Sequence, residues 1–164
     1  MFLDELYGGG VISRLTHHSH VWFTSQELGQ TLAHYLVVRS GNETVAYGGM
    51  WLLVDEAHIT TIAVRPEYRG RGFGEMLMIG LIEKATEVGA RWVTLEVRVS
   101  NTVAQNLYRK YTFHAEGVRK GYYSDNNEDA VIMWSDDIRT PEFQQKFATL
   151  KADFERRRRE DHRE

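Results

Sequence analysis

A glycine-rich stretch between residues 69 and 74 has the composition of an anion-binding loop. Its sequence is Arg69-Gly70-Arg71-Gly72-Phe73-Gly74, so glycines alternate with two arginines and a phenylalanine. Glycines leave backbone N–H groups unshielded by side chains, and the arginines add full positive charges. The stretch therefore predicts an anion site, and a phosphate or pyrophosphate fits it best.

The elements on either side of this loop must position it. Ala57 to Val64 is β-branched and apolar enough to be a strand, and Met76 to Val88 is a long, mostly apolar run that stops at Gly89, as a helix does. A loop that joins the end of a strand to the start of a helix also gains the unpaired N–H groups and the partial positive charge of the first helical turn.

Two nucleotide-binding motifs are excluded by spacing. A Walker loop requires Gly-Lys followed by Ser or Thr, and the chain contains no such run. A dinucleotide fingerprint counted from Gly70 needs its third glycine at position 75, where Glu75 stands. On its own, the stretch is equally compatible with a glycine-rich turn that carries two solvated arginines.

Composition limits the functions that need to be considered. With 164 residues and a net charge of −3, the chain has the size of one domain and no composition that demands nucleic acid as a partner. It contains no cysteine, which excludes disulfides, thiolate metal sites and cysteine nucleophiles. No apolar run approaches the roughly 20 residues that span a bilayer. We expect a cytoplasmic protein with no metal site and no membrane contact.

The remaining elements follow from periodicity and turn signals. In the first half, Thr24 or Ser25 is predicted to cap a short helix through about Ala33, and Gly48-Gly49 predicts a bulge or a close backbone approach within a strand. Further strands are expected at residues 35–39, 44–54, 91–99, 113–123 and 129–134, and a short helix capped by Ser100 or Asn101 precedes the last two. The strand at 91–99 should lie parallel to the strand at 57–64.

The C-terminal segment is expected to form a helix of its own. Thr140 can cap it, Pro141 suits its first position, and an apolar stripe that includes Phe143 and Phe154 should pack on the domain or on a second copy. Residues 151–164 hold six basic and five acidic residues, so Arg156 to Arg159 predict a solvated helix end rather than an RNA-binding arm. We therefore expect a domain over residues 1–139 with an appended amphipathic helix over residues 140–164.

Several motifs together resemble the GNAT superfamily of acetyltransferases, and its ribosomal-protein-alanine N-acetyltransferase (RimI-like) branch in particular. The loop matches the signature Q/R-x-x-G-x-G/A, and the similarity extends over about Trp22 to Trp134. The further residues that carry it are Thr94 to Asn101, Ala104, Leu107-Tyr108, Phe113, Arg119 to Tyr123 and Glu128 to Met133. The resemblance implies an α/β (α+β) GNAT fold, in which helices flank a mixed, largely antiparallel twisted sheet with two splayed parallel central strands.

The same resemblance implies acetyl-coenzyme A (acetyl-CoA) as the acetyl donor and assigns residues to its binding. The backbones of Ile62, Ala63 and Val64 would bind the pantetheine arm, and Asn101 and Tyr108 would flank the thioester. The residues that would hold the pyrophosphate are Arg69, Gly70, Arg71, Gly72, Phe73, Gly74 and Glu75, with the two arginines as secondary contacts.

The reaction implied by the resemblance is direct acetyl transfer to an amine in a ternary complex. Glu96 would act as general base, Tyr108 as general acid, and the backbone N–H of Val64 would stabilise the oxyanion. A salt bridge between Glu96 and Arg98, and a purely structural Tyr108, are the competing interpretations.

The expected acceptor is the N-terminal α-amine of a protein, with a ribosomal protein as one candidate, and the enzyme would be a monomer or homodimer. Trp22, Tyr122 and Tyr123 would line the peptide site. The chain departs from the family where Thr112-Phe113 replaces a Gly-Phe pair and where His20-Val21 precedes the tryptophan. A GNAT that acetylates lysine side chains or a small amine, and a non-catalytic acyl-CoA sensor or interaction module, remain as alternatives.

Overall fold

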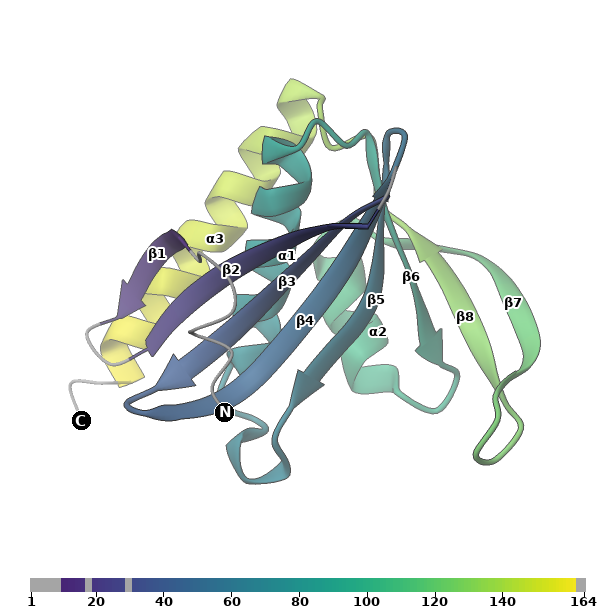
Figure 1. Cartoon of the computed structure of the whole chain (residues 1–164), viewed down its shortest axis with the longest axis horizontal. Coiled ribbons are helices and arrows are strands. Elements are labelled where there is room, and N and C mark those ends of the chain that lie inside the picture. Colours follow the sequence, from purple (N-terminus) through teal and green to yellow (C-terminus); the bar gives the residue numbers. More distant parts are fainter. Residues whose placement is uncertain (1–9, 17–18, 29–30, 162–164) are drawn as a thin grey trace.

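A single eight-stranded sheet forms the centre of the protein (Figure 1). The computed structural model describes residues 10–16, 19–28 and 31–161, with side chains from residue 33 onward. The strands lie in the order β1-β2-β3-β4-β5-β6-β8-β7. Their bounds are β1 Gly10–Thr16, β2 Ser19–Leu28, β3 Thr31–Ser40, β4 Glu43–Leu53, β5 Glu56–Val64, β6 Trp92–Arg98, β7 His114–Tyr123 and β8 Glu128–Trp134; the helices are α1 Phe73–Glu87, α2 Thr102–Lys110 and α3 Pro141–Asp161.

The three α-helices of the described residues lie behind the sheet in the view of Figure 1. Helix α1 is buried between the sheet and α3, and its apolar residues Met76 to Ile79, Leu81 and Ile82 are fully buried. The core that these side chains form includes Leu36 and Met50 from the sheet and Phe147 from α3. Enclosure between two layers explains why the predicted helix reads as an almost continuous apolar run.

The predicted helix between residues 24 and 33 is wrong, because residues 24–28 and 31–33 lie in two paired strands. Strand β2 pairs with β3 in unbroken antiparallel register, from Ser19 opposite Ser40 to Leu28 opposite Thr31. The helical interpretation rested on a capping residue, and such local signals are weak when a neighbouring strand offers a full ladder of backbone hydrogen bonds. Strand β1 extends the same sheet by pairing with β2.

Gly48 and Gly49 mark a bulge, as predicted. The register between β4 and β5 shifts between Gly49 and Met50, which leaves Thr60 as the extra residue on β5. A Cβ atom at position 49 would lie 2.9 Å from the ring of Tyr35, so the close approach also requires glycine. Bulges bend the strand that carries them and increase its twist.

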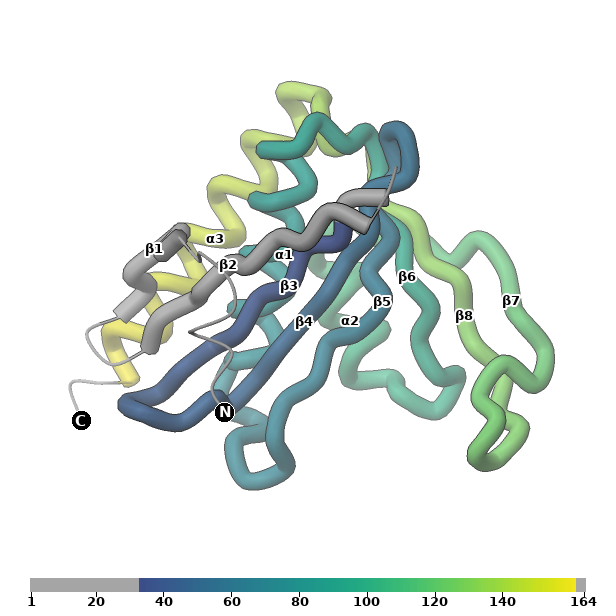
Figure 2. The backbone as a smooth tube through the Cα atoms, viewed as in Figure 1, coloured from purple at the N-terminus to yellow at the C-terminus, as the bar shows by residue number. Residues whose placement is uncertain are grey.

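The parallel pair β5–β6 opens immediately after this bulge. The two strands pair only from Glu56 opposite Trp92 to Ile59 opposite Leu95, although β5 continues to Val64 and β6 to Arg98. The ribbon shows them diverging like the arms of a V, and the tube view traces the same separation (Figure 1, Figure 2). The predicted pair of splayed parallel strands is confirmed, and the opening between them exposes unpaired strand edges.

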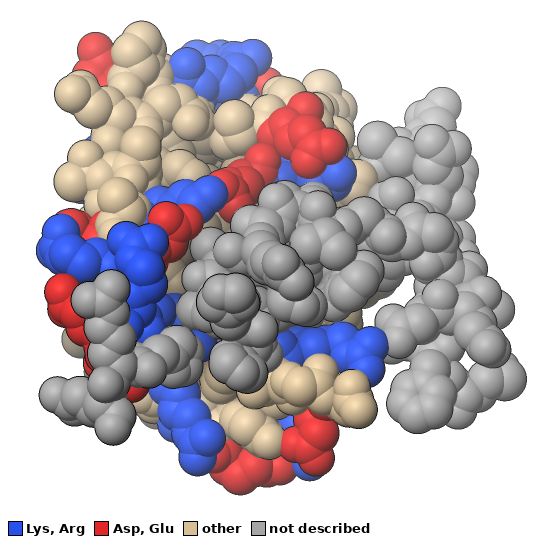
Figure 3. Space-filling view, turned by 90° about the vertical axis from the view of Figure 1, so that its left-hand side faces the viewer, with Lys and Arg blue, Asp and Glu red and all other residues tan. Residues whose placement is uncertain are grey.

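Helix α3 packs on the same chain. The Thr140 hydroxyl accepts a hydrogen bond from the N–H of Phe143 at 3.3 Å, which confirms the predicted cap. Phe143, Phe147 and Phe154 are buried in the core. The predicted solvated end is wrong for Arg158, which is only 8% exposed. The face seen in Figure 3 mixes basic and acidic side chains and shows no uniform basic patch.

Candidate active site

The glycine-rich loop has the backbone geometry of an anion cradle. Gly70 and Gly72 adopt left-handed conformations with φ of 74° and 78°, and α1 begins at Phe73, three residues earlier than predicted. The N–H groups of residues 70–75 find no acceptor among the described residues. Consecutive free N–H groups at a helix N-terminus form a concave donor surface that fits a diphosphate.

Side chains around the loop have defined partners. The Arg69 Nε donates to the Val64 carbonyl at 3.2 Å, and the guanidinium of Arg71 lies 5.2 Å from the centre of the Tyr68 ring. Phe73 is buried in the core. Phe73, one of the residues predicted to bind the pyrophosphate, can therefore contact an anion only through its backbone N–H.

Glu75 is likewise engaged elsewhere. Its Oε1 accepts hydrogen bonds from Lys110 at 2.5 Å, Tyr111 at 2.7 Å and Arg157 at 3.1 Å. Burial alone would raise the pKa of Glu75, but the hydrogen bonds from Lys110 and Tyr111 outweigh it and the pKa lies below its ordinary value. Only the backbone N–H of Glu75 therefore remains available to an anion.

The end of β5 directs backbone groups into the V-shaped opening. The Arg65 N–H donates to the Val45 carbonyl on β4 at 3.0 Å. Because successive residues of a strand direct their backbone groups to opposite sides, Ala63 also faces β4, whereas Ile62 and Val64 face the opening. Of the three residues predicted to bind the pantetheine arm, Ile62 and Val64 are the ones suited to do so.

Glu96 occupies the point where the two parallel strands separate. Its side chain is 7% exposed, and both carboxylate oxygens have a partner: Oε2 lies 3.1 Å from His58 Nε2, and Oε1 lies 3.1 Å from Arg119 Nε. The competing sequence interpretation, a salt bridge with Arg98, is wrong because Arg98 binds Asp125 and Glu128 at the β7–β8 turn.

A chain of hydrogen bonds leads from Glu96 to the surface. His58 Nδ1 lies 2.8 Å from the Thr94 hydroxyl oxygen, which in turn donates to Glu56 Oε1 at 2.6 Å. Since the Thr94 proton is directed at Glu56, the partners assign the His58 proton to Nδ1 and leave Nε2 facing Glu96. A stable contact between Nε2 and a carboxylate oxygen then requires one proton shared by the pair.

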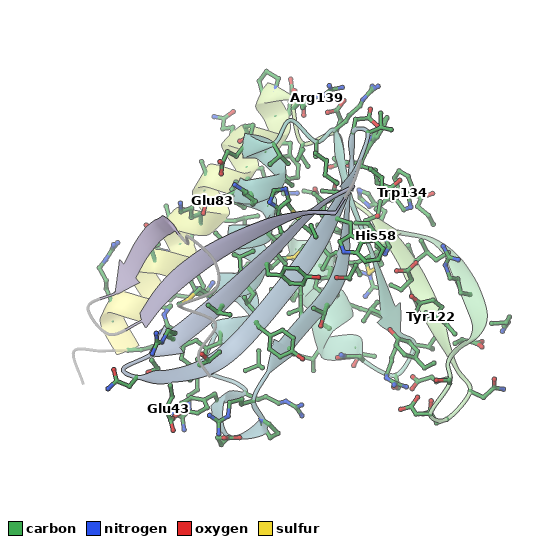
Figure 4. All side chains as sticks on the ribbon, in the orientation of Figure 1. Glu43, His58, Glu83, Tyr122, Trp134 and Arg139 are labelled. Carbon is green, nitrogen blue, oxygen red and sulfur yellow. The ribbon has the colours of Figure 1, made fainter. Side chains whose placement is uncertain are left out.

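A pocket of about 300 Å³ opens beside this pair. Its lining comes from four different strands, and Figure 4 places His58 near the start of the opening with Tyr122 on its far side. The rings of Tyr122 and Tyr123 meet edge to face, 5.1 Å apart. The structure thus brings Glu96 together with both predicted peptide-site tyrosines. The lining residues are Trp51, His58, Ile59, Thr60, Glu96, Tyr122 and Tyr123.

Tyr108 lies on α2 and Asn101 directly precedes this helix, and neither residue lines the pocket. Burial and then the neighbouring Tyr123 raise the pKa of Tyr108 to about 12, so this side chain stays protonated at neutral pH. Asn101 caps α2 by accepting a hydrogen bond from the Ala104 N–H at 3.1 Å, which confirms one of the two predicted caps. Trp22 belongs to β2, whose side chains are outside the described residues.

Comparison with known proteins decides the family. The model of the acetyltransferase (GNAT) family matches residues 5–113. This chain belongs to the GNAT acetyltransferases. The family uses acetyl-CoA, and membership makes the protein an N-acetyltransferase, as the sequence predicted.

Two curated relatives of this GNAT protein carry the same type of name. The chain is 47% identical over 112 residues to a Bacillus subtilis (strain 168) protein named "Putative ribosomal protein bS18-alanine N-acetyltransferase". The aligned residues make up 68% of this chain and 74% of that protein. It is also 33% identical over 122 residues to the ribosomal protein bS18-alanine N-acetyltransferase of Escherichia coli (strain K12). That alignment covers 71% of this chain and 81% of the Escherichia coli protein. The crystal structure of the ribosomal-protein-S18-alanine N-acetyltransferase from Escherichia coli aligns with a TM-score of 0.58 at 33% identity, over 62% of this chain and 66% of that one.

The candidate site also holds residues that were not predicted from the sequence, which are Trp51, His58, Ile59, Thr60 and Arg119. They contact Glu96 or share its pocket only because the sheet brings β4, β5, β6 and β7 together. The signal that could have revealed His58 is its place in the parallel pair, directly opposite Thr94. Among the described residues, no group of His, Asp or Glu could hold a metal ion, and no helix is long and apolar enough to cross a membrane.

Proposed function

We propose that this enzyme transfers the acetyl group of acetyl-CoA to the α-amine of a protein N-terminus, with a ribosomal protein N-terminus that begins with alanine as the leading candidate. The observation that carries the proposal is the placement of Glu96, held by His58 and Arg119, in a pocket walled by Tyr122 and Tyr123. The names of the relatives support the same acceptor.

In the proposed mechanism, Glu96 and His58 act together to deprotonate the amine. When neither side chain holds the shared proton, lone pairs of Oε2 and Nε2 face each other across 3.1 Å. Uptake of one proton from the amine removes this repulsion, and Arg119 compensates the charge on the other oxygen of Glu96. Thr94 and Glu56 keep the imidazole in the tautomer that this step needs.

The other groups serve the acetyl donor. Acetyl-CoA supplies the thioester that the amine attacks when both substrates are bound. The N–H of Val64, which faces the opening, donates to the carbonyl oxygen as charge develops on it. Tyr108, with its pKa raised to about 12, supplies a proton to the leaving sulfur. Ile62 and the cradle at residues 70–75 hold the donor in place.

A peptide panel tests the proposed acceptor. We expect acetylation of a peptide that carries the N-terminal sequence of ribosomal protein bS18, and no acetylation of the same peptide with its α-amine blocked and an internal lysine left free. Thiol release and the mass of the product report the reaction. Turnover on the blocked peptide or on small amines would instead indicate the alternative acceptors, and tight cofactor binding without turnover on any amine would indicate a sensor.

A further inference from the structure

The last turns of α3 lie directly beneath the cofactor loop. Arg158 Nη1 donates to the Arg71 carbonyl oxygen at 2.7 Å, although the two residues are 87 positions apart. A Cβ atom at position 72 would lie 3.4 Å from this same nitrogen and 3.3 Å from the ring of Phe154. Helix α3 therefore contacts the loop backbone at the centre of the predicted pyrophosphate site.

Arg158 is a buried cation without an ion pair in the described part of the chain, where only the charge of Asp161 acts on it from a greater distance. It is 8% exposed, its Nε has no hydrogen-bond partner, and no carboxylate of the described residues lies within ion-pair distance. Burial lowers the pKa of Arg158. Its neighbours are aromatic, with the guanidinium 5.1 Å from the centre of the Phe73 ring. A buried charge of this kind is costly unless an opposite charge approaches it.

The hydrogen bond from Arg158 also sets the direction of the loop's donors. In a planar trans peptide, the carbonyl of Arg71 and the N–H of Gly72 point to opposite sides. Because the carbonyl points at Arg158 below, the Gly72 N–H points away from α3, toward the side on which an anion can approach. A donor on the carbonyl polarises the peptide and strengthens its N–H as a donor.

We propose that Arg158 is a positioning residue for the cofactor diphosphate, so that α3 is part of the acetyl-CoA site. It fixes the peptide plane between Arg71 and Gly72 and places a positive charge below the cradle, and the bound diphosphate supplies the missing negative charge. The inference rests on the acetyl-CoA dependence of the proposed function but not on the identity of the acceptor.

The proposal is tested by binding to the full-length protein. Calorimetric titration with coenzyme A compares the wild type with Arg158→Met, which removes the charge, and with Arg158→Lys, which keeps it. We expect a loss of affinity of about 10- to 100-fold for Arg158→Met, and a smaller loss for Arg158→Lys. Arg159→Met is the matched control, since Arg159 is exposed on the same helical turn, and its affinity should equal that of the wild type.

S-acetylpantetheine, which lacks the diphosphate, separates positioning from general damage. Its affinity should be unchanged in both Arg158 variants, and the rise in melting temperature on adding coenzyme A should shrink in Arg158→Met. An equal loss for both ligands, or unchanged coenzyme A affinity in a folded Arg158→Met, would overturn the proposal. If the wild type binds coenzyme A but acetylates no peptide, the proposed acceptor is wrong while the role of Arg158 still stands on these titrations.

Discussion

The Nε2 atom of His58 lies 3.1 Å from Oε2 of Glu96, on neighbouring parallel strands, directly beside the last residue pair before the strands part. Hydrogen bonds from His58 Nδ1 to Thr94 and from Thr94 to Glu56 fix the orientation of the imidazole. The carboxylate of Glu96 lines the pocket, where an amine can reach it. In the proposed mechanism, proton transfer therefore depends on residues from both strands of the opening.

Glu96→Gln should abolish most of the activity while leaving the cofactor site intact. The amide cannot accept the amine proton, so we expect kcat/KM on the peptide to fall by roughly 10²- to 10⁴-fold. Steady-state kinetics measure the loss, and titration with coenzyme A should give the wild-type Kd. Glu116→Gln serves as control, because Glu116 is exposed on β7. Full activity in Glu96→Gln would assign the base elsewhere.

Thr94→Val tests the tautomer of His58 without touching the catalytic pair. Thr94 is 2% exposed, and valine has nearly the same shape but can neither accept from Nδ1 nor donate to Glu56. A lost hydrogen bond to a charged network corresponds to roughly a 10- to 100-fold lower kcat/KM. Thr94→Ser keeps the hydroxyl and should restore kcat/KM. Equal values of kcat/KM in Thr94→Val and Thr94→Ser would contradict a role for Thr94 in the mechanism.

Tyr108→Phe should lower kcat without changing the alkaline limb of the pH profile below about pH 11. With a pKa raised to about 12, Tyr108 remains protonated through this range. Because the pKa of Tyr108 in the folded protein lies above the ordinary value of 10.0, the protonated hydroxyl stabilises the folded state fully below pH 10. This stabilisation is lost as the pH rises toward 12. Ultraviolet titration of wild type against Tyr108→Phe should reveal one tyrosine that ionises near pH 12. Its ionisation near pH 10 would contradict the burial argument.

Gly72→Ala should weaken cofactor binding more than its backbone strain explains. Gly72 has φ of 78°, and a methyl group there would lie 3.3 Å from Phe154. We expect a loss of about 1–3 kcal/mol in stability from the left-handed conformation, with a clear rise in the Kd for coenzyme A. Gly41→Ala is the matched control, since Gly41 has φ of 59° and free space around it in the β3–β4 turn. Equal Kd values for coenzyme A in Gly72→Ala and Gly41→Ala would show that Gly72 does not contribute to the cofactor site.

The parts that sequence predicted correctly are those set by neighbouring residues. The loop, the strand before it and the helix after it depend on glycine, β-branched residues and an apolar run within about 30 positions. Thr140 and Pro141 start α3 for equally local reasons. The helix expected at residues 24–33 failed because the pairing of β2 with β3 decides its structure.

The partners of Glu96 could not be predicted because they depend on strand order. Arg119 reaches Glu96 from β7, which follows β8 in space, and Trp51 enters the pocket from β4. Arg158 was misjudged for the same reason: a run of four arginines indicates solvent exposure, yet one of them is buried under a loop formed far earlier in the chain.

The contact between Arg158 and Arg71 makes the cofactor loop depend on a residue that is synthesised late. Synthesis proceeds from the N-terminus, so the strands and α1 are available well before the last turns of α3. The loop backbone gains its support only when position 158 has been added. A chain that ends before position 158 lacks this contact, and we expect it to bind acetyl-CoA more weakly than the wild type.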